Sequence, residues 1–213
     1  FTINRARQFG KTTTLKALFR NLSDQYVVIS ISFEIGDAIF DSVEGFCEGL
    51  GFKISEAAGV TSEQADFWLN ECKCASFEGL SAKISAFCKL QTKPVLLLID
   101  EVDKSTDNQL FLNFLGMLRN KYLDRDVKGM NSTFHSVVLA GVYDVKNLKL
   151  KLRPDEERKY NSPWNIAAKF KVDMTFHPDE IITMLNEYEA DHHTGMNRDF
   201  IAKEIYKYTN GYP

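Results

Sequence analysis

The stretch Val95-Leu96-Leu97-Leu98-Ile99-Asp100-Glu101 places five aliphatic residues directly before two carboxylates. A short, wholly apolar run of this kind is typical of a strand covered on both faces, as in a parallel sheet. Ligands of α/β proteins bind at the carboxyl ends of such strands. The stretch therefore predicts an α/β fold, with Asp100 and Glu101 at the ligand-binding edge of its sheet.

A second segment, Arg5-Ala6-Arg7-Gln8-Phe9-Gly10-Lys11-Thr12-Thr13, lies between a short apolar run and a helical pattern. This order, closed by Gly-Lys-Thr, is that of a phosphate-binding P-loop, although Arg5 stands where the full pattern has glycine. In a P-loop the lysine reaches the terminal phosphates and the next hydroxyl binds Mg²⁺, roles that we assign to Lys11 and Thr12. The other nucleotide-binding residues expected in the loop are Arg7, Gln8, Phe9, Gly10 and Thr13.

Together the two segments predict a site for a nucleoside triphosphate, with ATP and Mg²⁺ as the expected ligands. Asp100 would hold the metal with Thr12, and Glu101 would orient and deprotonate the attacking water. Glu101 and Lys11 are thus the expected catalytic residues. The competing interpretation is that Asp100 and Glu101 merely cap the helix that follows.

Apolar runs rich in Val and Ile alternate with stretches of helical period along the chain, as in a parallel sheet with crossover helices. The strands are expected at residues 1–4, 26–33, 95–100, 135–142 and 169–174. The helices are expected at residues 11–22, 36–50, 62–72, 77–90, 107–122, 178–190 and 198–208. This pattern predicts a three-layer αβα sandwich around a mainly parallel, five-stranded sheet.

Two domains are expected: a P-loop core over residues 1–176, and a helical segment over residues 177–213 that starts a truncated lid or winged-helix region. Polar residues that follow other strands are candidates for sensing the γ-phosphate or restraining Glu101, and the charged loop 151–163 could supply an arginine finger. These candidates are Ser32, Glu34, Tyr143, Asp144, Arg153 and Arg158. The alternative interpretation is that Glu34 lies in the first turn of the next helix and that Arg153 and Arg158 are solvated, and Tyr143 and Asp144 are not the Asn or Thr most often found at a sensor position.

The composition excludes several classes of protein. The chain has 213 residues, of which 44% are hydrophobic and 26% charged, and its net charge is −3. These values are typical of a globular protein and unlike a disordered or collagenous chain, and a basic nucleic-acid binder is not favoured. The longest apolar run is far below the roughly 20 residues of a membrane span. Four cysteines without zinc-ligand spacing suggest reduced thiols in the cytoplasm.

The loop Arg5-Ala6-Arg7-Gln8-Phe9-Gly10-Lys11-Thr12 resembles the Arg-Pro-Arg-Arg-Phe-Gly-Lys-Ser loop of bacterial AAA-like ATPases, relatives of the AAA+ and STAND NTPases. In that family an arginine commonly replaces the first P-loop glycine, as Arg5 does here. Further similarity lies in residues 98–101, 161–167 and 209–213. The last of these ends in Gly-Tyr-Pro, which resembles the Gly-x-Pro signature that opens the lid and can touch the nucleotide. The resemblance therefore adds Pro213 to the expected nucleotide-binding residues.

The leading hypothesis is Mg²⁺-dependent ATP binding and hydrolysis by a switch or motor module of a longer protein. Self-association or a fused effector region would provide its partners. The first alternative is a regulatory nucleotide-binding switch with little or no hydrolysis. The second is a DNA-associated defence or mobile-element ATPase, supported only by basic residues at Lys146, Lys149, Lys151 and Arg153.

Overall fold

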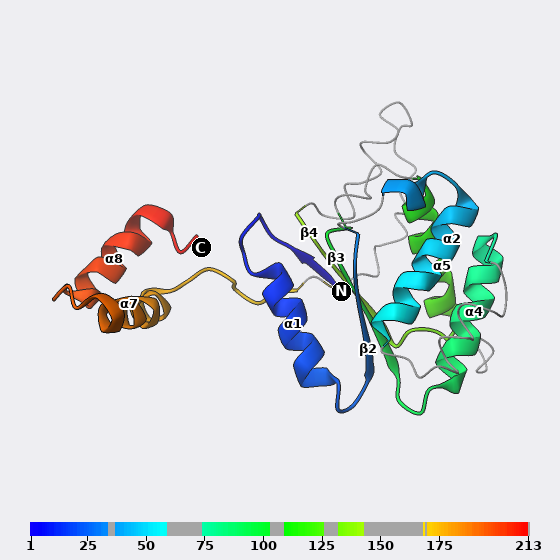
Figure 1. Cartoon of the computed structure of the whole chain (residues 1–213), viewed down its shortest axis with the longest axis horizontal. Coiled ribbons are helices and arrows are strands. Elements are labelled where there is room, and N and C mark those ends of the chain that lie inside the picture. Colours follow the sequence, from blue (N-terminus) through cyan, green and yellow to red (C-terminus); the bar gives the residue numbers. More distant parts are fainter. Residues whose placement is uncertain are drawn as a thin grey trace. The chain divides into compact units, whose positions relative to one another are not determined.

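The computed structural model describes residues 1–33, 37–58, 74–102, 109–125, 132–142, 168 and 170–212. Within these ranges the chain forms an α/β fold with four parallel strands and six α-helices (Figure 1). The described residues divide into two compact units. The first comprises residues 1–5 and 11–170, and the second comprises residues 6–10 and 171–213.

The sheet belongs to the first unit and has the strand order β1-β4-β3-β2, with every pair parallel. Its strands are β1 (Thr2–Asn4), β2 (Val27–Ser32), β3 (Val95–Asp100) and β4 (Ser136–Gly141). Each lies within a predicted strand, and β3 has its predicted bounds. The register pairs Ser32 with Asp100, so β2 and β3 end side by side.

The predicted fifth strand is not formed by the described residues of its range. Thr2 donates its N–H to the Ala168 carbonyl (3.0 Å) and accepts the Phe170 N–H (3.0 Å), so the chain meets the β1 edge at one residue. From Lys171 onward the chain belongs to the second unit, where Val172 is 55% exposed. Within the described residues the pairing with β1 is therefore limited to Thr2, and the fifth strand is not confirmed.

The helices of the first unit largely match their predictions. They are α1 (Lys11–Leu22), η1 (a 3-10 turn, Asp37–Phe40), α2 (Val43–Ala57), α4 (Phe77–Leu90) and α5 (Gln109–Asp124). The single helix predicted for 36–50 is wrong, because the Ser42 side chain accepts the Gly45 N–H (3.0 Å) and starts a new helix there. The apolar face of α2 then continues to Ile54, so α2 does not end at Leu50. The helix predicted at 62–72 lies outside the described residues.

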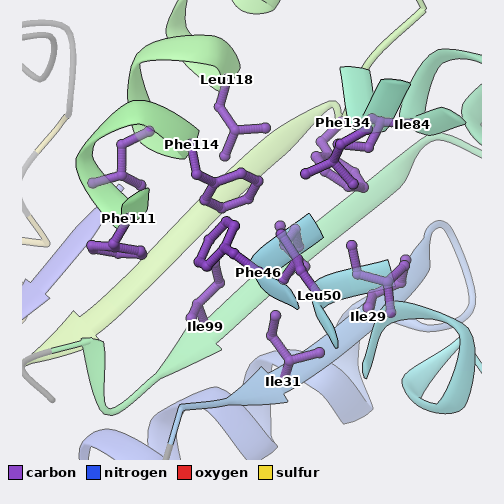
Figure 2. Packing of buried hydrophobic residues seen from close by; sticks show 14 of the residues in the cluster. Ile29, Ile31, Phe46, Leu50, Ile84, Ile99, Phe111, Phe114, Leu118 and Phe134 are labelled. Atoms are coloured by element: carbon purple, nitrogen blue, oxygen red, sulfur yellow. The ribbon is translucent and has the colours of Figure 1, made fainter. Parts of the chain in front are cut away.

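Alternate residues of each strand face opposite sides of the sheet. In β2 and β3 the odd-numbered positions, such as Ile29, Ile31 and Ile99, join a continuous apolar cluster with α2, α4 and α5 (Figure 2). Even-numbered positions such as Leu96 and Leu98 are equally buried but lie outside that cluster. Helix α1 packs against β2, β3 and β4 on the other face (Figure 1). Both faces of the sheet are therefore covered, as the apolar strands predict.

The second unit contains α7 (Pro178–His192) and α8 (Arg198–Thr209), which pack together. Glu180 accepts the His177 N–H (2.8 Å) at the start of α7, and Asn197 accepts the Phe200 N–H (3.1 Å) at the start of α8. These caps satisfy backbone groups that a helix leaves unpaired at its first turn. None of the helices in the described ranges has the length and apolar character needed to cross a membrane.

Candidate functional site

The strand order brings the start of α1 to the carboxyl end of β3. Strand β1 leads into α1, which crosses beneath β4 and β3 to reach β2 on the far side of the sheet. Thr12, in the first turn of α1, donates its hydroxyl hydrogen to Asp100 Oδ2 at 2.5 Å. Two segments that are remote in sequence, the Gly-Lys-Thr loop and the acidic end of β3, therefore meet in the first unit.

Both carboxylate oxygens of Asp100 have a partner. Oδ2 accepts from Thr12, and Oδ1 accepts the Glu101 backbone N–H at 2.9 Å. Asp100 is only 7% exposed, so these two hydrogen bonds fix its orientation at the sheet edge. Glu101 has a left-handed backbone with φ 54°, an uncommon conformation for a non-glycine residue and one that is found at active sites.

Lys11 is held at the same edge by the end of β1. Its side chain is buried, and Nζ donates to the Arg5 carbonyl at 3.1 Å. The Arg5 N–H in turn donates to Gly141 at the end of β4 (3.1 Å). Arg5 has no positive φ, so its backbone conformation does not require the glycine of the full P-loop pattern. The departure from that pattern therefore costs no backbone strain.

The tip of the loop, residues 6–10, belongs to the second unit. Gln8 and Gly10 both adopt left-handed conformations, with φ 67° and 66°. The Tyr212 hydroxyl donates to the Arg7 carbonyl at 3.0 Å, and the Tyr212 ring contacts Phe9 edge-on with ring centroids 4.8 Å apart. The loop tip therefore has defined partners in the C-terminal turn.

Oxygen ligands suited to Mg²⁺ come from Thr12 and Asp100. Hard divalent cations prefer carboxylate and hydroxyl oxygens, and Mg²⁺ bound with a nucleotide usually takes one or two protein ligands, completing its shell with phosphate and water. The described residues contain no cluster of three or more His, Cys, Asp or Glu that could hold a metal by themselves. The Thr12 and Asp100 pair thus fits a metal that arrives with a phosphate ligand.

Some of the predicted site residues lie within the described ranges, and others lie outside them. Ser32 pairs with Asp100 in the sheet and so ends beside the site, and Thr13 lies exposed on α1. The predicted residues outside the described ranges are Glu34, Tyr143, Asp144, Arg153, Arg158 and Pro213, together with the basic residues Lys146, Lys149 and Lys151.

Tyr212 is the residue that sequence reasoning missed. The Gly-Tyr-Pro signature predicts a role for Pro213. The residue that contacts Arg7 and Phe9 in the structure is Tyr212, which lies between the glycine and the proline of that signature. The sequence feature that could have indicated Tyr212 is its aromatic side chain within a signature already expected near the nucleotide.

The chain matches the AAA-like domain family over residues 1–213 and therefore belongs to that family. This confirms the resemblance to AAA-like proteins that the loop and the β3 end predict. Membership in this family indicates a nucleotide-binding module of ATPase type. A comparison with curated proteins found no match.

Proposed function

We propose that this chain binds ATP with Mg²⁺ and hydrolyses it, serving as a switch or motor module. The observation that carries the proposal is the hydrogen bond between Thr12 and Asp100, which joins the phosphate loop to the acidic strand end. A helix cap by Asp100 and Glu101 alone would not require the hydroxyl of a residue in α1. Family membership supports the same class of function.

Each residue then has a chemical role. The Lys11 ammonium exchanges its Arg5 carbonyl for phosphate oxygens, which are stronger, charged acceptors. Thr12 and Asp100 would hold Mg²⁺, which neutralises the phosphate charge when bound. Glu101, adjacent to Asp100 and half-buried, orients the attacking water and accepts its proton.

A second candidate, a regulatory switch with slow turnover, is favoured by one observation. Tyr212 contacts both Arg7 and Phe9, so a C-terminal segment is in direct contact with the phosphate loop. Such contacts suit a module that reports nucleotide occupancy, whatever its hydrolysis rate. A DNA-associated role remains a hypothesis based on sequence alone, because its basic residues lie outside the described ranges.

The test is a phosphate-release assay on the parent chain, Glu101→Gln and Glu48→Gln. Glu48 lies exposed on α2 and provides a matched control for loss of one carboxylate. We expect Glu101→Gln to lower the rate by about 100-fold or more while ATP binding persists, because a positioned base contributes roughly that much. Glu48→Gln should match the parent.

Equal rates for Glu101→Gln and the parent would contradict the role of Glu101. ATP binding by the parent without phosphate release over hours would select the regulatory switch instead.

A further inference from the structure

The C-terminal turn contacts the phosphate loop through one side chain, Tyr212. We propose that Tyr212 is a positioning residue that holds the loop tip in its phosphate-binding conformation, so that nucleotide affinity depends on the order of the C-terminal segment. This inference rests on the proposed function and adds a means of regulating the same site.

The hydrogen bond from Tyr212 fixes the orientation of a peptide group. Its hydroxyl donates to the Arg7 carbonyl at 3.0 Å. The described residues contain no cis peptide bond, so the Gln8 N–H points in the opposite direction from that carbonyl. Backbone N–H groups are the phosphate donors of such loops. The hydrogen bond to the Arg7 carbonyl therefore also sets the direction of the Gln8 N–H, one of the expected phosphate donors.

The loop needs such support because its backbone is strained. Gln8 has φ 67°, a conformation that carries a steric cost for any residue with a Cβ. Strained conformations persist where surrounding contacts determine them. Here the contacts lie on both sides of Gln8, at the Arg7 carbonyl and at the Phe9 ring, 4.8 Å from the Tyr212 ring.

Tyr212 is itself held by a well-bonded turn. Its N–H donates to the Thr209 carbonyl (3.0 Å), and the Gly211 carbonyl accepts the Phe176 N–H (2.9 Å). Gly211 has φ 75°, and a Cβ there would lie 2.5 Å from the Phe176 carbonyl oxygen. This turn follows directly on α8, so unfolding of α8 would release Tyr212 and with it the loop tip. Coupling of this kind is reciprocal: a nucleotide bound to the loop should protect the C-terminal turn.

The first test measures loop order in the nucleotide-free chain. The {1H}-15N heteronuclear NOE at Gln8, Phe9 and Gly10, which reports backbone order, should be lower in Tyr212→Phe than in the parent, and lower still in Tyr212→Ala. Tyr208→Phe is the control, because Tyr208 lies at the end of α8 and is 79% exposed. Unchanged NOE values in both Tyr212 variants would overturn the proposal.

The second test measures ATP affinity in the presence of Mg²⁺. Loss of one exposed hydrogen bond in Tyr212→Phe should weaken binding about threefold to tenfold, and loss of the ring as well in Tyr212→Ala should weaken it more than tenfold. Affinity equal to or tighter than that of the parent would overturn the proposal. If the parent binds no ATP, the proposed function fails, and the NOE measurement alone decides whether Tyr212 orders the loop.

Discussion

Gly211 is a residue whose neighbours leave no room for a side chain. A Cβ at this position would lie 2.5 Å from the Phe176 carbonyl oxygen and 3.1 Å from the Phe176 nitrogen, and φ is 75°. Gly195 has almost the same backbone, with φ 72°, but nothing within 4 Å of its Cβ position. Substitutions at these two glycines therefore distinguish the cost of a left-handed backbone from the cost of steric overlap.

We predict that Gly195→Ala destabilises the second unit by about 1 kcal/mol, the cost of a left-handed backbone with a Cβ. Gly211→Ala should cost at least about 2 kcal/mol, because strain and overlap add. The free energy of opening of α8, measured by native-state hydrogen exchange, checks both values. Equal effects of the two substitutions would show that the contact with Phe176 is not rigid.

Cys47 gives the first unit a dependence on pH. It is fully buried in α2, and this burial, with smaller contributions from Cys74 and Glu78, raises the pKa of its thiol to about 11 from an ordinary value of 9.0. The raised folded-state pKa means that the unfolded chain loses its proton first. The stability due to this thiol is therefore complete below pH 9 and is lost as pH rises toward 11.

The measurement compares urea unfolding of the parent and Cys47→Ala, under reducing conditions, at pH 8 and pH 10.5. The alanine variant has no thiol to titrate, so the stability gap between the two proteins should shrink by about 2 kcal/mol at the higher pH. A gap that is the same at both pH values would contradict the raised pKa.

At the scale of elements, α2 packs against η1, α4 and α5 through a buried aromatic residue, Phe46. Phe46 is fully buried, and its ring centroid lies 5.8 Å from that of Phe114 (Figure 2). The ring centroids of Phe40 and Phe77 lie 5.6 and 5.8 Å from it. Phe52, on the same helix, is 55% exposed.

We predict that Phe46→Ala lowers the free energy of unfolding by about 3–5 kcal/mol, since a large side chain is removed from a packed core. Phe52→Ala should change it by less than about 0.5 kcal/mol, as for ordinary surface positions. Urea unfolding followed by circular dichroism measures both. A similar loss for both variants would mean that helix propensity, rather than packing, holds α2 in place.

The elements differ in how well their sequences predict them. Strand β3 and helices α1 and α4 have their predicted bounds. A local signal marks one end of each: the acids at the end of β3, the Gly-Lys start of α1 and the serine cap at the start of α4. The sequence pattern does not predict the division between η1 and α2, because it depends on the Ser42 cap and on packing that continues to Ile54. The fifth strand is not confirmed by the described residues, and a strand depends on pairing with its neighbour as well as on its own sequence.

Pairs of elements are joined by contacts that no local pattern reveals. Lys121 of α5 is buried, and its Nζ donates to the Ser81 carbonyl (2.9 Å) and to the Ser85 hydroxyl (2.6 Å) of α4. This burial lowers the pKa of Lys121. Sequence reasoning would place such a lysine on a solvated helix face, since its partners are some 40 positions away.

At the scale of the whole molecule, the candidate site is made by topology. The sequence predicts Lys11, Thr12 and Asp100 as separate motifs, and the strand order is what brings Thr12 to Asp100. The contact of Tyr212 with Arg7 spans almost the full chain and could not be predicted from spacing. The sequence thus predicts which kinds of residue form the candidate site, whereas the contacts between those residues depend on the fold.

The central claim is that Lys11 and its neighbours form an ATP site, and calorimetric titration with ATP tests it most directly. The proteins are the parent, Lys11→Ala and Lys16→Ala, whose lysine is exposed on the same helix. We predict binding to the parent and Lys16→Ala that strengthens with Mg²⁺ over EDTA, and loss of at least about 100-fold in affinity for Lys11→Ala, as expected for a charged hydrogen bond in a buried site. Failure of the parent to bind ATP, or equal affinity in Lys11→Ala, would contradict the account.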